Sequence, residues 1–468
     1  MEMCRKLFSL VEVVVGLHQI AGAFYDTSLL MLVRDRCSSN STTSGGRDQQ
    51  QEAISRFYMI YLLLLRITPL FFTFFLAKLG DQRSRKITIY VPLLGYLVSR
   101  SLLLFVILFH WPLEVMFATA LVNGLTGGFT AFWAGVMAFA SDTSSQEKRS
   151  IRLNRVELTY GVAGMIGSMA SGHLFIVFKI SLGRGAGLMV ASCVFYALTL
   201  VCSFLGLKSS PKQTPSGSHG YGSLLDQAQQ ESDNGANPED QADNATWNQS
   251  QRSRLPDNQN NPVTQDNPRG DVSVDKAIIA LLFAAGVLYD LGVSGGADVL
   301  PIFVLKDPLN WNAVWVGYGN ATGYALFLTS FLGVLFFSKW LKDTSLIVMG
   351  MVSFSTGMLI MAFVEWTFLY FIARAVMIFA LIPMATIRSV ISKQIKDTSY
   401  GKLFAMLQIL LTLTGVIAST AFLNIYNSTQ DWYPSVCFSL SSAISCLGVI
   451  PIMMVERRLS NPAAFPGY

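Results

Sequence analysis

Charge is scarce in this sequence. Only 13% of its 468 residues are Asp, Glu, Lys or Arg, whereas 52% are hydrophobic, and the mean hydropathy is +0.45. A typical water-soluble domain carries about 25% charged residues. The composition therefore excludes an ordinary soluble fold and favours a protein that lies in a membrane.

Arrangements of reactive side chains are also missing. The six cysteines show none of the paired spacings that bind metals. No Ser/His/Asp order, metal-ligand cluster or phosphate-binding loop stands out. The sequence gives an enzyme little support, and we expect no metal, no cofactor and no nucleic-acid partner. Buried free thiols are the favoured interpretation of the cysteines, with an outer disulfide between Cys37 and Cys437 as the alternative.

Apolar residues gather into twelve long runs. Each is about 20 residues or longer, the length that an α-helix needs to cross a hydrocarbon layer of roughly 30 Å. The runs cover 7–33, 57–77, 87–109, 113–140, 156–178, 186–207, 276–304, 313–338, 345–364, 367–391, 402–426 and 433–455. The first has no small-residue cleavage site and is expected to be a retained helix rather than a signal peptide. We predict an all-α membrane protein with twelve transmembrane helices.

A polar segment divides the runs into two groups of six. From 208 to about 275 the chain is rich in Ser, Gln, Asn, Asp, Pro and Gly, with too few large apolar groups to offset the entropy of ordering. Two six-helix bundles around such a linker are the arrangement of the major facilitator fold. The predicted units are an N-terminal bundle (1–207), a disordered cytoplasmic linker (208–275), a C-terminal bundle (276–456) and a cytoplasmic tail (457–468).

The first helix of each predicted half shares one charge pattern. An acid is followed at +8 by a base and at +9 by a second acid: Asp26, Arg34 and Asp35 in one half, and Asp298, Lys306 and Asp307 in the other. The match supports a duplicated origin of the two halves.

Loop charges and side chains predict the orientation. Lys and Arg gather at the termini and at the even-numbered connections, whereas the loops near Trp111, Trp366 and Trp432 have none. Short cytoplasmic loops collect basic residues, so both termini should face the cytoplasm. Five tryptophans are expected at outer helix ends as an aromatic belt: Trp111, Trp311, Trp315, Trp366 and Trp432. The sequons at Asn40 and Asn427 also fall outside, and we predict glycosylation there.

Charges inside the apolar runs are the first candidates for a site. A charged side chain in hydrocarbon costs at least about 2.5–3.5 kcal/mol, so such groups should face water or a partner. Asp26, Asp290 and Asp298 are the acidic candidates, and Arg100 and Arg374 are the deepest basic ones. The alternative is a set of structural interhelical pairs that never touch a solute. Arg66 and His18 are weaker candidates.

The segment 79–86 after the second run has an acid followed by basic residues. This pattern resembles the major-facilitator signature between the second and third helices. There the acid, here Asp81 with Arg85 and Lys86, is expected to pair across the bundle interface and gate the transporter. The alternative is an ordinary basic cytoplasmic loop.

Several stretches carry a resemblance to one family. Residues 47–55, 127–138, 167–175, 374–383 and 387–389 resemble the small solute-carrier family of the major facilitator superfamily that contains the proton-coupled folate transporter. The resemblance implies twelve helices, a glycosylated first outer loop and transport of anionic organic solutes, folate-like in one branch and muropeptide-like in others.

The resemblance also implies roles for two residues. Glu157 matches an acid linked to proton coupling, and Arg388 matches a substrate-linked arginine. Arg388 can clamp a carboxylate through two parallel hydrogen bonds, and a desolvated carboxyl such as Glu157 can take up a proton. The alternative for both is anchoring at the membrane interface. Val293, Gly128 and Asn310 replace a histidine, an acid and a disulfide cysteine of the folate transporter, which argues against folate itself.

These observations predict a secondary transporter that works by alternating access in a lipid bilayer. A small anionic solute is expected to bind near Arg388 and Arg374, with Asp26, Asp290 and Asp298 close by. Protons, carried by Glu157 or by the two aspartates Asp290 and Asp298, are the second expected partner. The competing hypotheses are a non-transporting scaffold or receptor and, behind it, a membrane enzyme. The plasma membrane is the expected location, with endolysosomal membranes as the alternative.

Overall fold

The computed structural model describes residues 10–39, 46–82, 86–142, 149–182, 186–206, 276–394, 400–430 and 432–460. Within these ranges the regular structure is helical and contains no strand, which confirms the all-α prediction. The predicted linker over 208–275, the end of the tail after Ser460 and the sequon at Asn40 lie outside the described residues.

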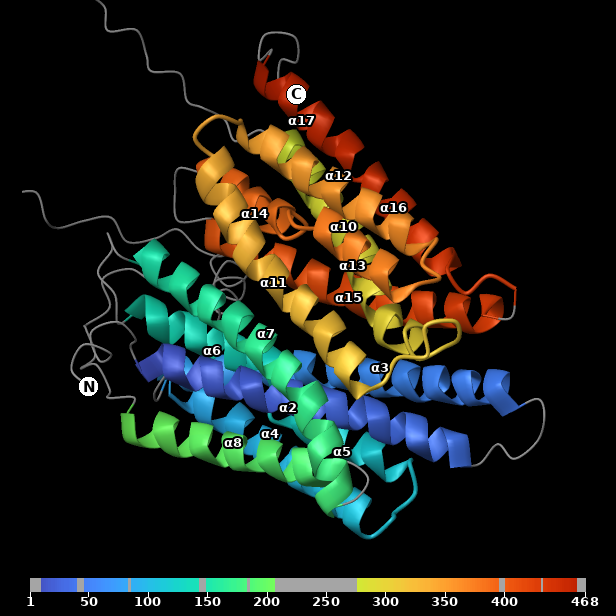
Figure 1. Ribbon diagram of the computed structural model, residues 1–468. Coiled ribbons are helices and arrows are strands. Elements are labelled where there is room, and N and C mark those ends of the chain that lie inside the picture. The colour runs from blue at the N-terminus through green and yellow to red at the C-terminus, as the bar shows by residue number, and fades with distance from the viewer. Residues whose placement is uncertain are drawn as a thin grey trace, which may run out of the picture.

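The helices form two groups that lie side by side (Figure 1). The first, coloured blue to green, comprises α2 (Leu10–Ser39), α3 (Gly46–Gln82), α4 (Ile87–Leu108), α5 (Val115–Leu125), α6 (Gly128–Asp142), α7 (Arg149–Leu182) and α8 (Ala186–Gly206). The second, coloured yellow to red, comprises α10 (Lys276–Phe303), α11 (Ala313–Phe337), α12 (Asp343–Met361), α13 (Thr367–Val376), α14 (Ile382–Gln394), α15 (Tyr400–Thr429), α16 (Val436–Leu447) and α17 (Val449–Ser460).

Each group packs around its own first helix. In the N-terminal group α2 contacts α7 and α8, while α4 contacts α5, α6 and α8. In the C-terminal group α10 contacts α15, α16 and α17, while α12 contacts α13, α14 and α16. The two groups meet along α7 with α11 and along α3 with α15.

Ten helices or helix pairs among the described residues are long and apolar enough to cross a membrane. The remaining two predicted runs are also helical but depart from a plain apolar span. The helix α2 carries Glu12, His18, Gln19 and Asp26, and the run over 367–391 is divided into the short helices α13 and α14. Polar residues and a break are features that a functional helix has and a simple anchor does not need.

Three predicted runs are broken rather than continuous. The run over 113–140 divides between α5 and α6, where Gly127 and Gly128 have φ angles of +87° and +50°. A Cβ at Gly127 would lie 2.5 Å from Cβ of Ala131, and one at Gly128 would lie 3.3 Å from Cγ of Pro69. Only glycine fits both the backbone conformation and the close approach of α3. The runs over 367–391 and 433–455 divide likewise at 377–381 and at Gly448.

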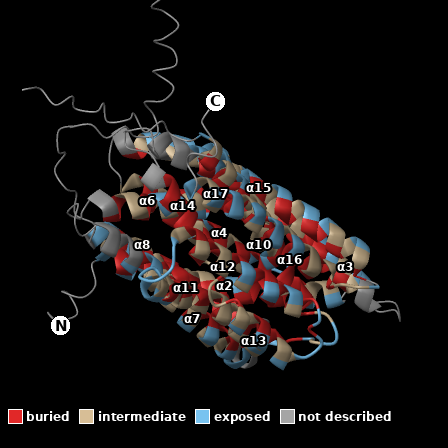
Figure 2. Ribbon diagram, turned by 90° about the horizontal axis from the view of Figure 1, so that it is seen from above, coloured by how far each residue is buried: buried red, intermediate tan, exposed pale blue. Residues whose placement is uncertain are grey.

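The outward surface of the bundle is apolar. Large hydrophobic side chains such as Phe71, Phe75, Phe204 and Leu205 are more than half exposed. Figure 2 shows buried residues along the inward faces of the helices and exposed ones along the outward faces. A surface of this kind excludes water and suits contact with lipid tails, as a multi-pass membrane protein requires.

The prediction of an interfacial belt is wrong for one tryptophan. Trp111, Trp315, Trp366 and Trp432 are exposed, but Trp311 is only 2% exposed. The segment after α10 folds back so that the Trp311 ring packs 4.6 Å from the Tyr370 ring, and its Nε1 donates to Thr367 Oγ1 at 2.9 Å. Trp311 is therefore a packing residue of the C-terminal half.

The alternative of an outer disulfide is excluded, because Cys37 and Cys437 are both free thiols. Cys437 is buried and donates to the Phe422 carbonyl at 3.3 Å. Asn427 lies in the last turns of α15 and is half-buried, so its glycosylation stays a prediction.

Small residues form the seam between the two groups. A Cβ at Gly172 of α7 would lie 2.6 Å from the Ala313 carbonyl oxygen, and one at Gly317 of α11 would lie 2.5 Å from the Ser168 carbonyl oxygen. The backbones of α7 and α11 thus touch directly, as small residues allow in membrane helices. This direct contact explains why small residues stand at these positions of α7 and α11.

Gly172→Ala should lower the thermal stability of the purified protein, because the new methyl group meets backbone atoms that cannot move aside. Gly286→Ala is the matched control, since its Cβ would have no neighbour nearer than 3.8 Å. Unfolding followed by fluorescence-detected size exclusion should show a lower midpoint for the first variant and an unchanged or higher one for the second. Equal midpoints would contradict direct backbone contact at this seam.

Candidate functional site

An ion pair joins the two halves near the middle of the bundle. Arg66 of α3 places Nη2 2.9 Å from Oδ1 and 2.8 Å from Oδ2 of Asp298 on α10. Its Nη1 donates to the carbonyl oxygen of Gly415 on α15. The side chains are only 27% and 11% exposed, so solvent screens this pair weakly. Arg66 belongs to the N-terminal half, whereas both of its partners belong to the C-terminal half.

Further charges continue from this pair towards the opposite end of the helices. Asp290, two turns before Asp298 on α10, interacts electrostatically with both Arg66 and Arg388. Arg388 of α14 donates from Nη2 to Gln408 Oε1 at 3.2 Å. Arg388 also attracts Glu157, which lies on α7 in the other half.

We call these five residues the central charge row: Asp298, Arg66, Asp290, Arg388 and Glu157. Two come from the N-terminal half and three from the C-terminal half, and in this order their charges alternate in sign. The side chains of Arg388 and Glu157 are exposed, and each interacts with the other half. Because Arg388 and Glu157 interact with each other across the junction of the halves, their charged groups do not face lipid.

A second charged cluster lies within the N-terminal half. Arg100 of α4 is only 6% exposed, and its guanidinium carbon lies 3.4 Å from the centre of the Tyr25 ring and 5.1 Å from that of Tyr96. The Arg100 Nη1 donates to Ser99 Oγ at 3.2 Å. Asp26, next to Tyr25, attracts this arginine. Desolvated cation–π contacts of this type are worth about 2 kcal/mol each, which helps to offset the burial of the charge.

Asp26 connects this cluster to the junction of the halves. Its side chain is exposed, and it interacts electrostatically with Tyr160 of α7 and Tyr324 of α11. The rings of Tyr160 and Tyr324 lie 5.9 Å apart, and Tyr160 also lies 5.4 Å from the Phe327 ring. Aromatic faces from both halves therefore border the charged groups.

Hydrogen bonds close the halves against each other at the end where α2 finishes and α11 begins. Arg34 donates to the Trp311 carbonyl and to Asn310 Oδ1. Gln51 of α3 donates through Nε2 to the Ile302 carbonyl at 2.8 Å and to Tyr426 Oη at 2.9 Å. These contacts define one closed end of the junction.

The structure brings together some of the predicted site residues and separates others. Asp290, Asp298, Arg388 and Glu157 share the central charge row. Asp26 lies with Arg100 in the separate N-terminal cluster. Arg374 is half-buried on α13, where its Nε donates to Tyr370 Oη at 3.2 Å, and no interaction described for it reaches the central charge row.

The predicted gating segment is described only in part. Lys86 directly precedes α4, whereas Arg85 and the side chain of Asp81 lie outside the described residues. The gating role of these three residues stays a prediction. His18, a weaker candidate in the sequence, packs its ring 4.1 Å from Phe132 and 4.8 Å from Tyr96, and its Nδ1 has no hydrogen-bond partner among the described residues.

Arg66 is the residue that sequence reasoning undervalued. A single cation in the middle of a long apolar run is costly, and that signal alone could have ranked it with the other intramembrane charges. Its partner could not be found in this way, because Asp298 is 232 residues away and its position depends on how the two halves dock.

Two helical groups that enclose charges at their junction are the architecture of a membrane transporter. The model of the Major Facilitator Superfamily matches residues 51–419. Solute carrier family 46 member 2 from the dog, Canis lupus familiaris, is 44% identical over 96% of this chain and 94% of its own length. The chain therefore belongs to solute carrier family 46 of the Major Facilitator Superfamily, a group of transporters and not of enzymes.

More distant matches agree with this assignment. A human protein described as a lysosomal proton-coupled steroid conjugate and bile acid symporter is 28% identical over 90% of this chain and 84% of its own length. The crystal structure of the POT family transporter PepTSo superimposes with a TM-score of 0.63 at 10% identity, covering 97% of this chain and 99% of that one. The second match shows the shared fold.

The Arg66–Asp298 pair predicts a measurable energetic coupling. Removing one partner leaves the other as an uncompensated, largely buried charge, at a cost of about 3–5 kcal/mol for a fully buried pair and less here. Arg66→Ala and Asp298→Ala should each lower thermal stability. The loss in the double variant should be smaller than the sum of the two single losses. Additive losses would mean that the two side chains do not interact in the folded protein.

Proposed function

We propose that this protein is a secondary transporter that carries a small organic anion together with a proton through the junction of its two halves. The observation that supports the proposal most strongly is the central charge row, in which ionisable groups from both halves interact across that junction. A membrane anchor or scaffold has no use for such groups, because each of them is costly in hydrocarbon.

The recognition of an anion falls to Arg388. A guanidinium has five N–H donors in a fixed fork, and the one hydrogen bond described for Arg388 goes to Gln408. The remaining donors suit a carboxylate, sulfate or phosphate, which accept two parallel hydrogen bonds. Because Arg388 is exposed at the junction, a solute can reach it without displacing a buried partner.

The charge balance of the row favours proton coupling. Its three acids exceed its two arginines by one, so an incoming anion adds negative charge to a site that already has an excess. One proton bound by Glu157, Asp290 or Asp298 offsets that excess, and solute and proton then bind together more favourably than either does alone. The human relative described as a proton-coupled symporter supports this pairing.

The aromatic side chains favour an amphipathic solute. Tyr160, Tyr324 and Phe327 meet between α7 and α11 beside the charged groups. Rings of this kind stack on apolar or ring-shaped parts of a ligand, while Arg388 holds its anionic end. Muropeptide-like, folate-like and steroid-conjugate anions all have this character, and the name of the human relative includes steroid conjugates and bile acids.

Alternating access requires that the closed end open. Arg34 and Gln51 tie the N-terminal half to the segment 302–311 and to Tyr426. With both termini in the cytoplasm, as the loop charges predict, this closed end is the outer one. The described conformation is then closed to the outside, and release of these hydrogen bonds forms the outward-facing state.

Uptake of labelled organic anions should test the role of the row. In cells expressing the protein at matched surface levels, a muropeptide, an antifolate and a bile acid conjugate are offered at pH 5.5 and 7.4. Uptake of at least one should rise at the lower pH, because protons are co-substrates. Glu157→Gln should abolish that rise, whereas Glu365→Gln, an exposed loop acid, should keep it.

Variants of Arg388 test the anion site in the same uptake experiment. Arg388→Ala should lose uptake, and Arg388→Lys should keep part of it at a raised KM, because lysine has the charge but not the two-pronged geometry. Absence of uptake of every anion in the wild-type protein would instead favour the scaffold or receptor hypothesis.

Arg34→Ala should shift the resting protein towards the outward-open state, because it removes hydrogen bonds from the closed end. Spin labels at Ser38 and Pro308, in a protein without its native cysteines, report the separation of the two outer ends by double electron–electron resonance. The distance should lengthen in Arg34→Ala. Arg36→Ala is the control, because Arg36 contacts His110 of its own half. An unchanged distance in both variants would contradict a role of the Arg34 hydrogen bonds in holding this end closed.

A further inference from the structure

Asp26 of α2 is exposed although side chains of five other helices surround it. Its carboxylate interacts electrostatically with one or more residues of each of these helices: Tyr58 of α3, Arg100 of α4, Tyr160 of α7, Tyr196 of α8 and Tyr324 of α11. A side chain that points towards lipid has protein neighbours on one side only. The exposure of Asp26 is therefore to a water-filled cavity inside the bundle.

Arg100 attracts Asp26 without binding it. No ion pair or hydrogen bond joins these two described residues, because the Arg100 guanidinium lies over the Tyr25 ring and donates to Ser99 Oγ. Arg100 is only 6% exposed, so a solute in the cavity meets the carboxylate and not the guanidinium. The carboxylate of Asp26 makes no hydrogen bond to any residue that the structure describes, which leaves its oxygens able to accept from a ligand.

The aromatic side chains beside Asp26 lead to the central charge row. Tyr160 follows Glu157 by three residues on α7, which is about one helical turn. The Tyr160 ring lies 5.9 Å from the ring of Tyr324, and both tyrosines interact with Asp26. Glu157 in turn interacts with Arg388. A solute whose anionic end is held by Arg388 and whose body lies against the two tyrosines therefore has its far end near Asp26.

The surroundings of Asp26 select a cationic nitrogen for that far end. An ammonium or amidinium group donates charge-assisted hydrogen bonds to a carboxylate, and it is also attracted to the faces of rings such as those of Tyr160 and Tyr324. An anionic group would be repelled by Asp26. An apolar group would displace water from the carboxylate and leave it unpaired within the membrane, which is costly.

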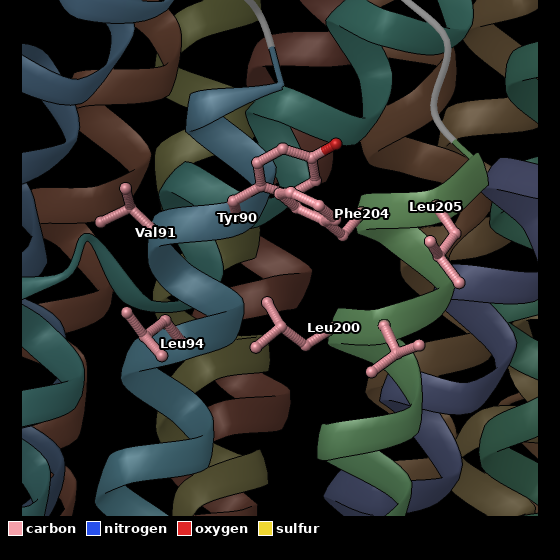
Figure 3. A pocket seen from close by; sticks show the side chains of 7 residues that line it. Tyr90, Val91, Leu94, Leu200, Phe204 and Leu205 are labelled. Carbon is pink, nitrogen blue, oxygen red and sulfur yellow. The ribbon is translucent and has the colours of Figure 1, made fainter.

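A groove between α4 and α8 offers no comparable site. Its lining is apolar and includes Leu94, Leu200 and Phe204 (Figure 3). A charged group would lose its hydration there and gain no partner. The cavity at Asp26 differs because it presents a carboxylate together with aromatic rings from both halves.

We propose that Asp26 is a second anchor of the transport site and binds a cationic nitrogen of the solute, whose anionic end is held by Arg388. The preferred solutes are then zwitterions with an apolar or ring-shaped centre. This inference rests on the proposed transport function and adds to it the charge at the far end of the solute.

Two pairs of rigid probes test this anchor: 4-(aminomethyl)benzoate and 4′-(aminomethyl)biphenyl-4-carboxylate, each with its N-acetyl derivative. Within a pair the positive charge is present or absent while the carboxylate and the rings stay the same. Binding to purified full-length protein at pH 7.4 is measured as the probe concentration that gives half of the maximal rise in the unfolding midpoint. In at least one pair the free amine should bind about tenfold more tightly, as expected of one charged hydrogen bond.

Three variants assign this preference to Asp26. Asp26→Asn should bring the ratio within a pair close to one, whereas Asp26→Glu, which keeps the charge, should retain part of the preference. Asp35→Asn is the matched control, because it removes the same charge from an exposed position at the outer end of the same helix, and it should bind like the wild type. A single size-exclusion peak verifies that each variant is folded.

The outcomes separate this proposal from the transport function itself. Equal binding of amine and N-acetyl forms by the wild type, or no binding of either, would overturn the second anchor, while anion uptake that depends on Arg388 would still stand. An unchanged preference in Asp26→Asn would overturn it as well. If that variant keeps the preference but loses the rise of anion uptake at low pH, Asp26 carries a proton and not a cationic group of the solute.

Discussion

The cost of placing a charge in hydrocarbon governs the rest of this structure. Apolar side chains cover the outward faces of the helices, while the ionisable groups deep in the spans lie between helices or at the junction of the halves. Arg66 is the clearest case, since it donates hydrogen bonds to the Asp298 carboxylate and to the Gly415 carbonyl oxygen of the opposite half. The same constraint that makes these groups expensive fixes them at the place where a solute can meet them.

The junction combines two kinds of contact with different consequences. Along α7 and α11, Gly172 and Gly317 bring backbones together without interlocking side chains, which permits one half to move against the other. At the closed end, Arg34 and Gln51 make directional hydrogen bonds that hold only one arrangement. Rocking of two rigid halves requires both features: backbone contacts along which the halves can move, and hydrogen bonds that can break at the closed end.

Sequence alone predicted the architecture well, because the hydrophobic runs and the polar segment between them report directly on membrane spans. It missed the breaks at Gly127 and Gly448, because a broken apolar helix has the same composition as a continuous one. It placed Trp311 at the interface, since the fold-back of the segment after α10 depends on long-range packing against Tyr370.

The candidate site was predictable as a set of residue types but not as a set of partners. Each intramembrane charge is visible in the sequence. The pairing of Arg66 with Asp298, and the separation of Arg374 from Arg388, depend on the docking of two halves that no local pattern encodes.

If the protein works by alternating access, the central charge row lines a water-filled path that opens to one side of the membrane at a time. Accessibility of Ser294, which neighbours Asp290 on α10, tests this most directly. In a chain whose six native cysteines are replaced, Ser294→Cys is treated with a membrane-impermeant maleimide from either side of the membrane. We expect labelling from the cytoplasmic side in the resting protein and protection by a transported anion. No labelling from either side would show a dry core and would contradict it.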